Sequence, residues 1–380
     1  MWYLENDNRE KIINLARKNK TPFYLYHIPT LQKEIDKYKS VFESCNVELL
    51  YAVKANFNKA ILKIIRNNGF GADVVSGWEL KRVIDCGFKK ISFSGVGKSD
   101  DEIILAIKNK IYFINIESFE EFERIKYFSK KLKIKTSISV RINPDVDINS
   151  HGYITTAKKY SKFGVDFQTA FDIYTNAQKS PYFDIKAVHF HLGSQIFSSK
   201  PYEIALKKII TFLDDLKKKG IHINIIDIGG GWGVKEGNEA KGHKKLFNVL
   251  RPYLKSYRFV LEPGRSIVAS SGVLVTKVLY RKKVYDKYIV IVDAGMNNLV
   301  RPSLYGAYHP IINLSSKSNK SVLLDIAGPV CESSDFFARN IRFPLPERDD
   351  ILIIASCGAY GYSMSSNYNL RPFTAEYLIY

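Results

Sequence analysis

The stretch VELLYAVKAN, residues 47–56, is an apolar run that leads directly into a lysine, Lys54. The run predicts a short buried β-strand over Val47–Val53. Burying an ammonium group without a partner is costly, so a lysine in this position usually has a shifted pKa or forms a covalent bond. A desolvated lysine amine is the group that forms Schiff bases with carbonyl compounds. The alternative is a lysine that reaches solvent from the strand end, and the downstream sequence distinguishes the two.

Similar runs recur through the first two thirds of the chain. Helix-like amphipathic segments separate them, for example Lys59–Asn67, Asp100–Lys108 and Pro201–Lys219. Eight strand-then-helix units in series predict an α/β fold with a parallel (β/α)8 barrel; an open, doubly wound sheet is the alternative, but eight units favour closure. The expected strands are Val47–Val53, Gly71–Val75, Ile91–Ser94, Tyr112–Ile116, Thr136–Ile142, Lys186–Leu192, Ile223–Ile228 and Arg258–Glu262.

The pattern changes after about residue 270. Strand-like runs then follow one another without long helices between them, which predicts a mostly antiparallel β domain. The N-terminal segment Thr21–Tyr26 predicts a further strand of that domain. We therefore expect an N-terminal segment (1–30) that joins the β domain, a barrel (31–270) and a C-terminal β domain (271–380). The strand-like runs are Gly272–Leu279, Tyr288–Val292, Ser321–Ile326 and Ile351–Ala355.

The composition is ordinary for a soluble globular protein, with 46% hydrophobic and 25% charged residues. No apolar run approaches about 20 residues, so we expect no membrane-spanning helix, and the N-terminus lacks the pattern of a signal peptide. The four cysteines have no paired or metal-ligand spacing, which predicts no metal site and favours a reduced, cytoplasmic location. The formal charge of +19 comes from lysines scattered along the chain and indicates a basic surface rather than a nucleic-acid partner.

Polar and glycine residues collect after the expected strands. In a (β/α)8 barrel the active site lies at the C-terminal ends of the strands. A strand histidine or a run of glycines has a structural explanation when taken alone, but seven of the eight expected strands carry such residues at this end. They are Lys54, Asp73 with Ser76, Ser94 with Gly95, Arg141 with Asn143, His189 with His191 and Ser194, Gly229–Gly231, and Glu262 with Gly264 and Arg265.

Three of these features together predict a pyridoxal phosphate site. Lys54 supplies the amine for a Schiff base, and the glycines after strands seven and eight let backbone N–H groups approach a phosphate. Glu262 would pair with the pyridine nitrogen and keep it protonated, so that the ring can accept electrons from a carbanion on the substrate. We expect His191 to stack on the ring, Arg141 to hold the periphery of the cofactor, and Ser194 to add a hydroxyl donor.

Short motifs extend over nearly the whole chain, from Thr21 to Pro372. They are Tyr51–Asn56, Asp73–Ser76, Phe93–Lys98, Arg141–Pro144, His191–Gln195, Asp227–Gly231, Glu262–Arg265, Val292–Met296, Arg301–Tyr305, Gly328–Ser333, Cys357–Gly361 and Met364–Asn369. Each is a weak pattern, but all of them in this order form a strong one. Together they resemble the fold-type III pyridoxal phosphate decarboxylases, and within them the diaminopimelate decarboxylases. The resemblance implies an alanine racemase-like architecture of a barrel followed by a β domain.

The resemblance also implies roles for the motif residues. Lys54 would carry the Schiff base, His191 would stack on the ring, and Cys331 would reprotonate the substrate carbanion. The distal carboxylate of the substrate would meet Arg265, Arg301 and Tyr305, and its distal ammonium would meet Glu332, with Tyr360 also in contact. The implied cofactor contacts are Lys54, Asp73, Arg141, His191, Ser194, Gly229, Gly230, Gly231, Glu262, Gly264, Arg265 and Tyr360.

The resemblance further implies a homodimer with shared active sites, to which the neighbouring subunit contributes Cys331 and Glu332. The C-terminal β domain would then carry both substrate and dimer contacts. The implied reaction is decarboxylation of meso-2,6-diaminopimelate to L-lysine and CO2, the last step of lysine biosynthesis. The chain departs from the family at Trp78 and Ala157, where glycine is usual, and at Asn298, where aspartate is usual.

Other functions remain as alternatives. A sibling decarboxylase would act on ornithine, arginine or carboxynorspermidine, but Arg301 and Tyr305 beside Glu332 suit a substrate with both a carboxylate and an amine at its far end. An alanine racemase-like isomerase usually has an arginine at the pyridine nitrogen, where this chain has Glu262. A basic nucleic-acid-binding protein would leave the strand-end motifs unexplained.

Overall fold

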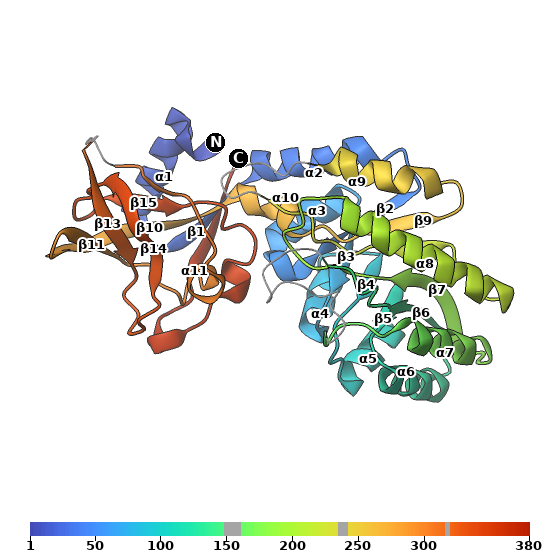
Figure 1. The fold of residues 1–380 in the computed structure, drawn as a ribbon. Coiled ribbons are helices and arrows are strands. Elements are labelled where there is room, and N and C mark those ends of the chain that lie inside the picture. Colours follow the sequence, from blue (N-terminus) through green and yellow to red (C-terminus); the bar gives the residue numbers. More distant parts are fainter. Residues whose placement is uncertain (148–160, 235–241, 316–319) are drawn as a thin grey trace. The chain divides into compact units, whose positions relative to one another are not determined.

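A computed structural model describes residues 1–147, 161–234, 242–315 and 320–380 (Figure 1). The chain forms two compact units. The barrel unit comprises Ile35–Gly233 and residues 242–264, and the sheet unit comprises Met1–Glu34 and Arg265–Tyr380. Among the helices of these described ranges, none has both the length and the hydropathy that a membrane crossing requires. The departure at Ala157 lies outside the described residues.

Eight parallel strands close into a barrel in the order β2 to β9. The closing pair joins β9 to β2, with Val47 opposite Phe259. Closure confirms the predicted barrel and excludes the open sheet. The strands are β2 (Val47–Ala52), β3 (Gly71–Val74), β4 (Ile91–Phe93), β5 (Phe113–Ile116), β6 (Thr136–Arg141), β7 (Phe183–His189), β8 (Ile225–Asp227) and β9 (Arg258–Leu261).

Amphipathic helices lie between the strands and surround the barrel (Figure 1). Many begin after a side-chain cap: Asn58, Ser76 and Ser99 each accept a hydrogen bond from a backbone N–H in the first turn of the next helix. The predicted bounds of α3 and α5 agree with the structure. The helices are α3 (Lys59–Asn67), α4 (Gly77–Asp85), α5 (Asp100–Lys108), α6 (Phe119–Leu132), α7 (Phe167–Gln178), α8 (Lys200–Lys218) and α9 (His243–Leu250).

The bounds of β7 differ from the prediction. The strand spans Phe183–His189 and not Lys186–Leu192. Phe190 and Leu192 are buried although they follow the strand, so the apolar pattern continues after the hydrogen-bonded ladder has ended. As a result His189 is the last residue of the strand, and His191 lies in the loop that follows it.

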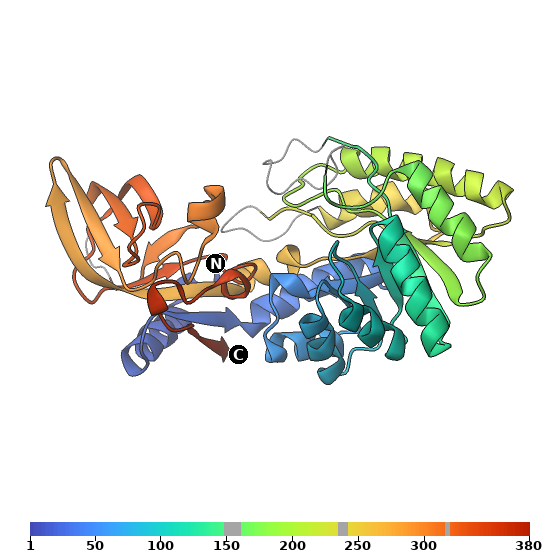
Figure 2. The same cartoon turned by 90° about the horizontal axis from the view of Figure 1, so that it is seen from below.

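The sheet unit is built around the long strand β10 (Gly272–Val284), which pairs antiparallel with β1 (Phe23–His27), β11 (Lys287–Val292) and β15 (Ile351–Ile354). Most pairs are antiparallel, as predicted, but β11 runs parallel to β13 (Ser321–Ala327). The last strand, β16 (Ala375–Ile379), runs parallel to β1, so a strand from the N-terminal part of the chain and a strand from its C-terminal part lie side by side (Figure 2).

Three strands of this unit were not predicted: β12 (Ile311–Asn313), β14 (Phe336–Pro344) and β16. β14 contains two arginines and an asparagine, and most of its residues are not buried, so it lacks the apolar run that marks a strand. Among its described residues the unit also contains α1 (Asn6–Lys18), α10 (Arg265–Val268) and α11 (Arg301–Tyr305). The helix α2 (Ile28–Phe42) begins in this unit, ends in the barrel unit and leads into β2. Ile12 and Ala16 of α1 pack in a buried cluster with Val273 and Val275 of β10.

Candidate active site

Lys54 lies on the short 3-10 turn η2 (Val53–Ala55) that follows β2. Its Nζ is 2.7 Å from Oδ2 of Asp73, a fully buried residue of β3. Burial and the charge of Glu262 raise the pKa of Asp73 above its usual value, while the Lys54 ammonium opposes this rise. The Lys54 side chain is 35% exposed. The amine therefore has a carboxylate partner and remains accessible to a carbonyl compound.

Glu262 follows β9 and is buried. Its Oε1 accepts a hydrogen bond from Ser92 Oγ at 3.2 Å, and its Oε2 lies 3.5 Å from Nε2 of His189. Burial alone would raise the pKa of Glu262, but the neighbouring His189 and then Lys54 outweigh burial and lower it well below the usual range. The site thus contains a buried carboxylate that stays negatively charged.

His191 is held by the glycine loop that follows β8. The backbone N–H of Gly230 donates to Nδ1 of His191 at 3.1 Å, so this nitrogen is an acceptor and carries no proton. Desolvation, followed by the charges of Arg141 and Lys54, lowers the pKa of His191 well below its usual value. The imidazole is therefore neutral, with its remaining proton on Nε2.

The glycine loop approaches its neighbours too closely for side chains. A Cβ on Gly229 would lie 2.5 Å from Nδ1 of His191, and one on Gly230 would lie 2.2 Å from the backbone oxygen of Glu262. Gly229 also has a φ of +66°, which disfavours other residues. The three glycines, Gly229–Gly231, are therefore required by the packing of the loop itself, in addition to any role with a phosphate.

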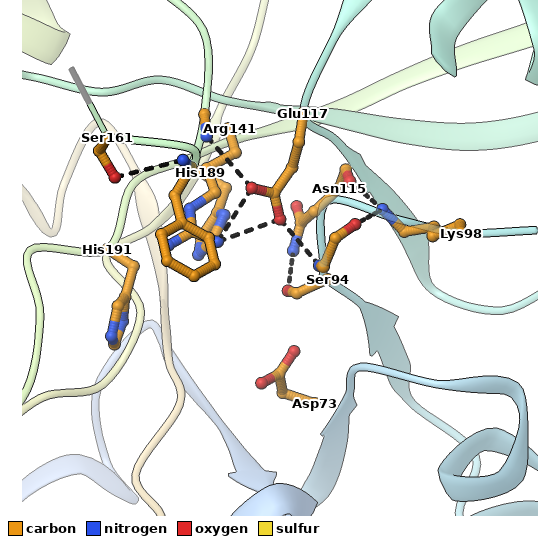
Figure 3. Close-up of polar contacts among 12 residues, drawn as sticks. Asp73, Ser94, Lys98, Asn115, Glu117, Arg141, Ser161, His189 and His191 are labelled. Atoms are coloured by element: carbon orange, nitrogen blue, oxygen red, sulfur yellow. Dashed lines mark hydrogen bonds and ion pairs between the residues drawn. The ribbon is translucent and has the colours of Figure 1, made fainter. Parts of the chain in front are cut away.

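Arg141, the last residue of β6, is buried and paired with Glu117, which follows β5 (Figure 3). Arg141 Nη1 lies 3.0 and 3.1 Å from the two carboxylate oxygens of Glu117. Glu117 also accepts from the backbone N–H groups of Gly95 and Gly164. Burial favours a raised pKa for Glu117, but Arg141 and then Lys98 lower it below the usual value. Glu117 thus holds the Arg141 guanidinium and the two loops that contain Gly95 and Gly164.

Lys98 extends this network to the next strand. Its buried ammonium donates to the backbone oxygen of Asn115 at 2.7 Å (Figure 3). It also donates to the backbone oxygen of Gly95 at 2.8 Å and to Glu121 at 2.6 Å. The contacts with Asn115 and Glu121 join the segment after β4 to β5 and to its following helix, and the contact with Gly95 closes the segment on itself. The Phe93–Lys98 motif therefore has a structural function that explains its lysine.

The other residues of the barrel unit that the sequence analysis singled out contact residues close to them in the fold. Ser194 is half-buried in the loop after His191. A Cβ on Gly264 would lie 3.0 Å from the Cβ atoms of Ala52 and Ala55, so this glycine packs against the segment that carries Lys54. Ser76 caps α4 and the Asn143 side chain accepts from the backbone N–H of Asp145, so both have local structural roles.

In the sheet unit, Arg301 is anchored by a histidine that the sequence analysis did not identify. Arg301 is buried at the start of α11, and its Nη1 lies 2.7 Å from Nε2 of His309. Nδ1 of His309 lies 2.8 Å from the backbone oxygen of Ala355. Burial and the charge of Arg301 lower the pKa of His309 to about 3. His309 is thus neutral, donating to Ala355 and accepting from Arg301.

The other predicted residues of the sheet unit are more exposed. The Arg265 guanidinium lies over the Tyr360 ring, 4.6 Å from its centroid. Tyr305 is half-buried at the end of α11. Cys331 and Glu332 are exposed neighbours, and the backbone N–H of Cys331 donates to Oδ1 of Asn369.

Within the barrel unit the structure therefore brings together most of the predicted cofactor residues. Lys54 and Asp73 form one pair, and Glu262 and His191 lie close enough to affect each other's charge. The sequence analysis assigned no role to Ser92, Glu117 or Asp227, although each lies on a strand or directly after one. Their positions on or after strands were a signal for all three, and Asp227 also begins the Asp227–Gly231 motif.

The barrel residues fit pyridoxal phosphate. Lys54 provides a paired but accessible primary amine, and Glu262 provides a buried anion suited to a protonated ring nitrogen. The loop Gly229–Gly231 provides backbone without side chains, which suits close approach by a phosphate. His191 provides a neutral aromatic face.

Comparisons with known proteins agree with this fit. Residues 29–269 match the family described as "Pyridoxal-dependent decarboxylase, pyridoxal binding domain". The chain is 40% identical to a diaminopimelate decarboxylase of Aquifex aeolicus, over 99% of this chain and 92% of the relative. It is 44% identical to that of Helicobacter pylori strain J99, over 95% and 91%.

Solved structures show the same similarity. The crystal structure of Helicobacter pylori diaminopimelate decarboxylase complexed with L-lysine superposes with a TM-score of 0.92 at 41% identity, covering 97% of this chain and 93% of that one. A lysine/ornithine decarboxylase of Vibrio vulnificus, at 19% identity and a TM-score of 0.86, shares the fold.

Proposed function

This chain belongs to the diaminopimelate decarboxylases, within the pyridoxal-dependent decarboxylase family, and from this premise we propose that it converts meso-2,6-diaminopimelate to L-lysine and CO2. Its cofactor is pyridoxal phosphate, and its reaction is the last step of lysine biosynthesis. One observation of the barrel unit carries the proposal: an accessible lysine amine, Lys54, lies in the same charge cluster as the buried anion Glu262.

Bound pyridoxal phosphate supplies an electron sink for the bond between Cα and the carboxylate that breaks. Lys54 presents the amine for covalent attachment, and Asp73 orients that amine. Glu262, which stays anionic, would accept the proton of the ring nitrogen in a charge-assisted hydrogen bond. His191 would place its neutral imidazole face against the ring, because Gly230 fixes the orientation and the protonation of its Nδ1.

Residues of the sheet unit are proposed to recognise the substrate and return the proton. Arg301, with Arg265 and Tyr305, would bind the distal carboxylate, since guanidinium groups pair with carboxylates in a fork. The neutral His309 supports this role, because it orients Arg301 without itself adding a negative charge beside the guanidinium. Cys331 would protonate Cα, and its exposed thiol supports that assignment.

We also propose that the chain acts as a homodimer in the cytoplasm, with Cys331 and Glu332 completing the site of the neighbouring subunit. The exposure of both residues supports contact with a partner. The four cysteines are free thiols, which supports a reducing compartment.

The test is CO2 release from meso-diaminopimelate, ornithine, arginine and carboxynorspermidine, with the absorbance of the bound cofactor measured in parallel. We expect release from meso-diaminopimelate alone, and Lys54→Ala should abolish both release and the Schiff-base absorbance. Lys63→Ala, which removes an exposed lysine of α3, is the matched control and should change neither. Faster release from ornithine, or no Schiff-base absorbance after cofactor addition, would contradict the proposal.

A further inference from the structure

Three buried side chains converge at the C-terminal ends of β7, β8 and β9, and one of them, Glu262, belongs to the predicted cofactor site. His189 and Asp227 are direct partners across β7 and β8, and Glu262 follows β9. A ring nitrogen of His189 and one carboxylate oxygen from each acid all lie within 4.8 Å of one another. The three residues are 1%, 0% and 4% exposed. Two carboxylates therefore lie close together where water does not reach them.

The hydrogen bonds of the two acids differ. Oδ1 of Asp227 accepts from the backbone N–H of Gly229 at 2.9 Å, but Oδ2 has no hydrogen-bond partner among the described residues. Glu262 has Ser92 as a donor to Oε1 and His189 beside Oε2. An ionised, buried oxygen without a donor is costly, whereas a protonated oxygen becomes a donor itself. Two neighbouring buried carboxylates also cannot both ionise cheaply.

We propose that Asp227 is a neutral carboxylic acid with its proton on Oδ2, so that Glu262 alone carries the negative charge of the pair. Asp227 is then a positioning residue, which donates toward Glu262 from the adjacent strand and keeps the Glu262 carboxylate in place for a cationic ring nitrogen. This role toward the cofactor rests on the proposed function. The protonation of Asp227 follows from the cluster alone.

The surrounding charges favour this distribution. Asp227 is raised in pKa well above its usual value by burial first and by Glu262 second, with Asp73 adding to the effect. The cationic and imidazole groups nearby, which are Lys54, His189 and His191, all act on Glu262 and lower its pKa. The available positive charge therefore stabilises the anion of Glu262, and the proton resides on Asp227.

The pH dependence of stability tests the protonation state. A folded-state pKa raised above the unfolded value of about 3.8 means that the folded chain holds a proton that the unfolded chain releases, so stability falls as pH rises. In thermal melts of the cofactor-free full chain from pH 5 to pH 8, the melting temperature of Asp227→Asn relative to that of the wild type should rise by about 2 °C per pH unit, because the variant lacks this contribution. Asp184→Asn, the same change at a partly exposed residue of β7, is the matched control and should keep the wild-type slope.

The proposal would be overturned if the melting temperature of Asp227→Asn depended on pH in the same way as that of the wild type. It would also be overturned if the variant melted below the wild type by an amount that grows as pH rises. Infrared spectra of the wild type give a second measurement if the variant does not fold: a protonated carboxylic acid band at neutral pH is expected, and its absence would overturn the proposal. Stabilisation of the cofactor-free wild type, but not of Asp227→Asn, by Zn²⁺ would instead identify the cluster as a metal site and overturn the protonation.

Cofactor titration tests the positioning role separately. An amide at position 227 can accept from Gly229 and donate to Glu262, whereas leucine can do neither. Pyridoxal phosphate affinity, followed by absorbance, should fall at least about tenfold in Asp227→Leu and much less in Asp227→Asn. Equal losses of pyridoxal phosphate affinity in the two variants would show that a hydrogen-bond donor at position 227 does not position Glu262. If the wild type bound no pyridoxal phosphate, the proposed function would fail while the result of the melts would stand.

Discussion

At the scale of single residues, three cations of the candidate site are each held by a specific partner. Asp73 pairs with Lys54, Glu117 with Arg141, and His309 with Arg301. The charge of the partner residue differs among these three pairs. The two barrel cations have carboxylate partners, whereas the neutral His309 orients Arg301 without cancelling the charge that a substrate carboxylate would need.

His309 gives a prediction about acid stability. Its folded-state pKa is lowered to about 3, while an unfolded histidine titrates near pH 6.5. As pH falls from 6.5 toward 3, the unfolded chain takes up a proton that the folded chain does not, so this residue makes the protein less stable in acid. His309→Gln should reduce the fall in melting temperature over this range by about 2 °C per pH unit.

Thermal melts at pH 7, 5.5 and 4 measure this effect. Glutamine retains an acceptor for Arg301, so the variant should still fold. His222→Gln, a change at an exposed histidine of the barrel unit, is the control and should keep the wild-type slope. An unchanged slope in His309→Gln would show that acid sensitivity comes from other groups.

At the scale of elements, the glycine loop after β8 connects three parts of the site. Its N–H groups donate to Asp227 and to His191, and its backbone packs against the carbonyl of Glu262. A shift in this loop would therefore move His191 and the Glu262 carboxylate together. The loop is a structural part of the site even before a phosphate binds.

Gly230→Ala tests this connection. The new Cβ would lie 2.2 Å from the backbone oxygen of Glu262, so the loop must move. We expect the affinity for pyridoxal phosphate, measured by absorbance titration, to fall at least about tenfold, with lower thermal stability. Gly97→Ala is the control, because its Cβ would meet nothing within 4 Å and its φ is not positive. Wild-type affinity in Gly230→Ala would show that the loop tolerates displacement.

The elements themselves could be predicted where burial and strand pairing coincide. All eight barrel strands overlap their predicted runs, because strands covered on both faces are rich in apolar residues. The end of β7 was wrong, since Phe190 and Leu192 are buried outside the ladder. β14 was missed because its exposed face is rich in arginine. The apolar pattern of a sequence indicates which residues are buried. It indicates the bounds of a hydrogen-bonded strand only where the buried residues are also the paired ones.

The candidate site, like the strands, could be predicted only in part. Lys54, His191 and Glu262 could be proposed as site residues because barrel geometry gathers strand ends. Glu117 and His309 were not, because a pair such as Glu117 with Arg141 depends on which side chains the strand register turns toward each other. A single sequence does not contain that register.

At the scale of the whole molecule, the motifs that identify the family come from both units. Lys54 belongs to the barrel unit, whereas Cys331 belongs to the sheet unit, and the proposed reaction requires both. If Cys331 acts in the neighbouring subunit's site, each site of a homodimer depends on two chains, and a two-fold axis generates two such sites. This arrangement can be tested without knowing the structure of the dimer.

Mixed dimers of Lys54→Ala and Cys331→Ala provide the test. In a mixed dimer one site receives both substitutions and the other receives neither, so one site is wild type. Random exchange of equal amounts of the two chains makes about half of the dimers mixed, and the activity should recover to about one quarter of the wild-type value. Differently tagged chains confirm exchange, and each variant incubated alone is the control. Exchange without any recovery would place Lys54 and Cys331 in the same chain's site.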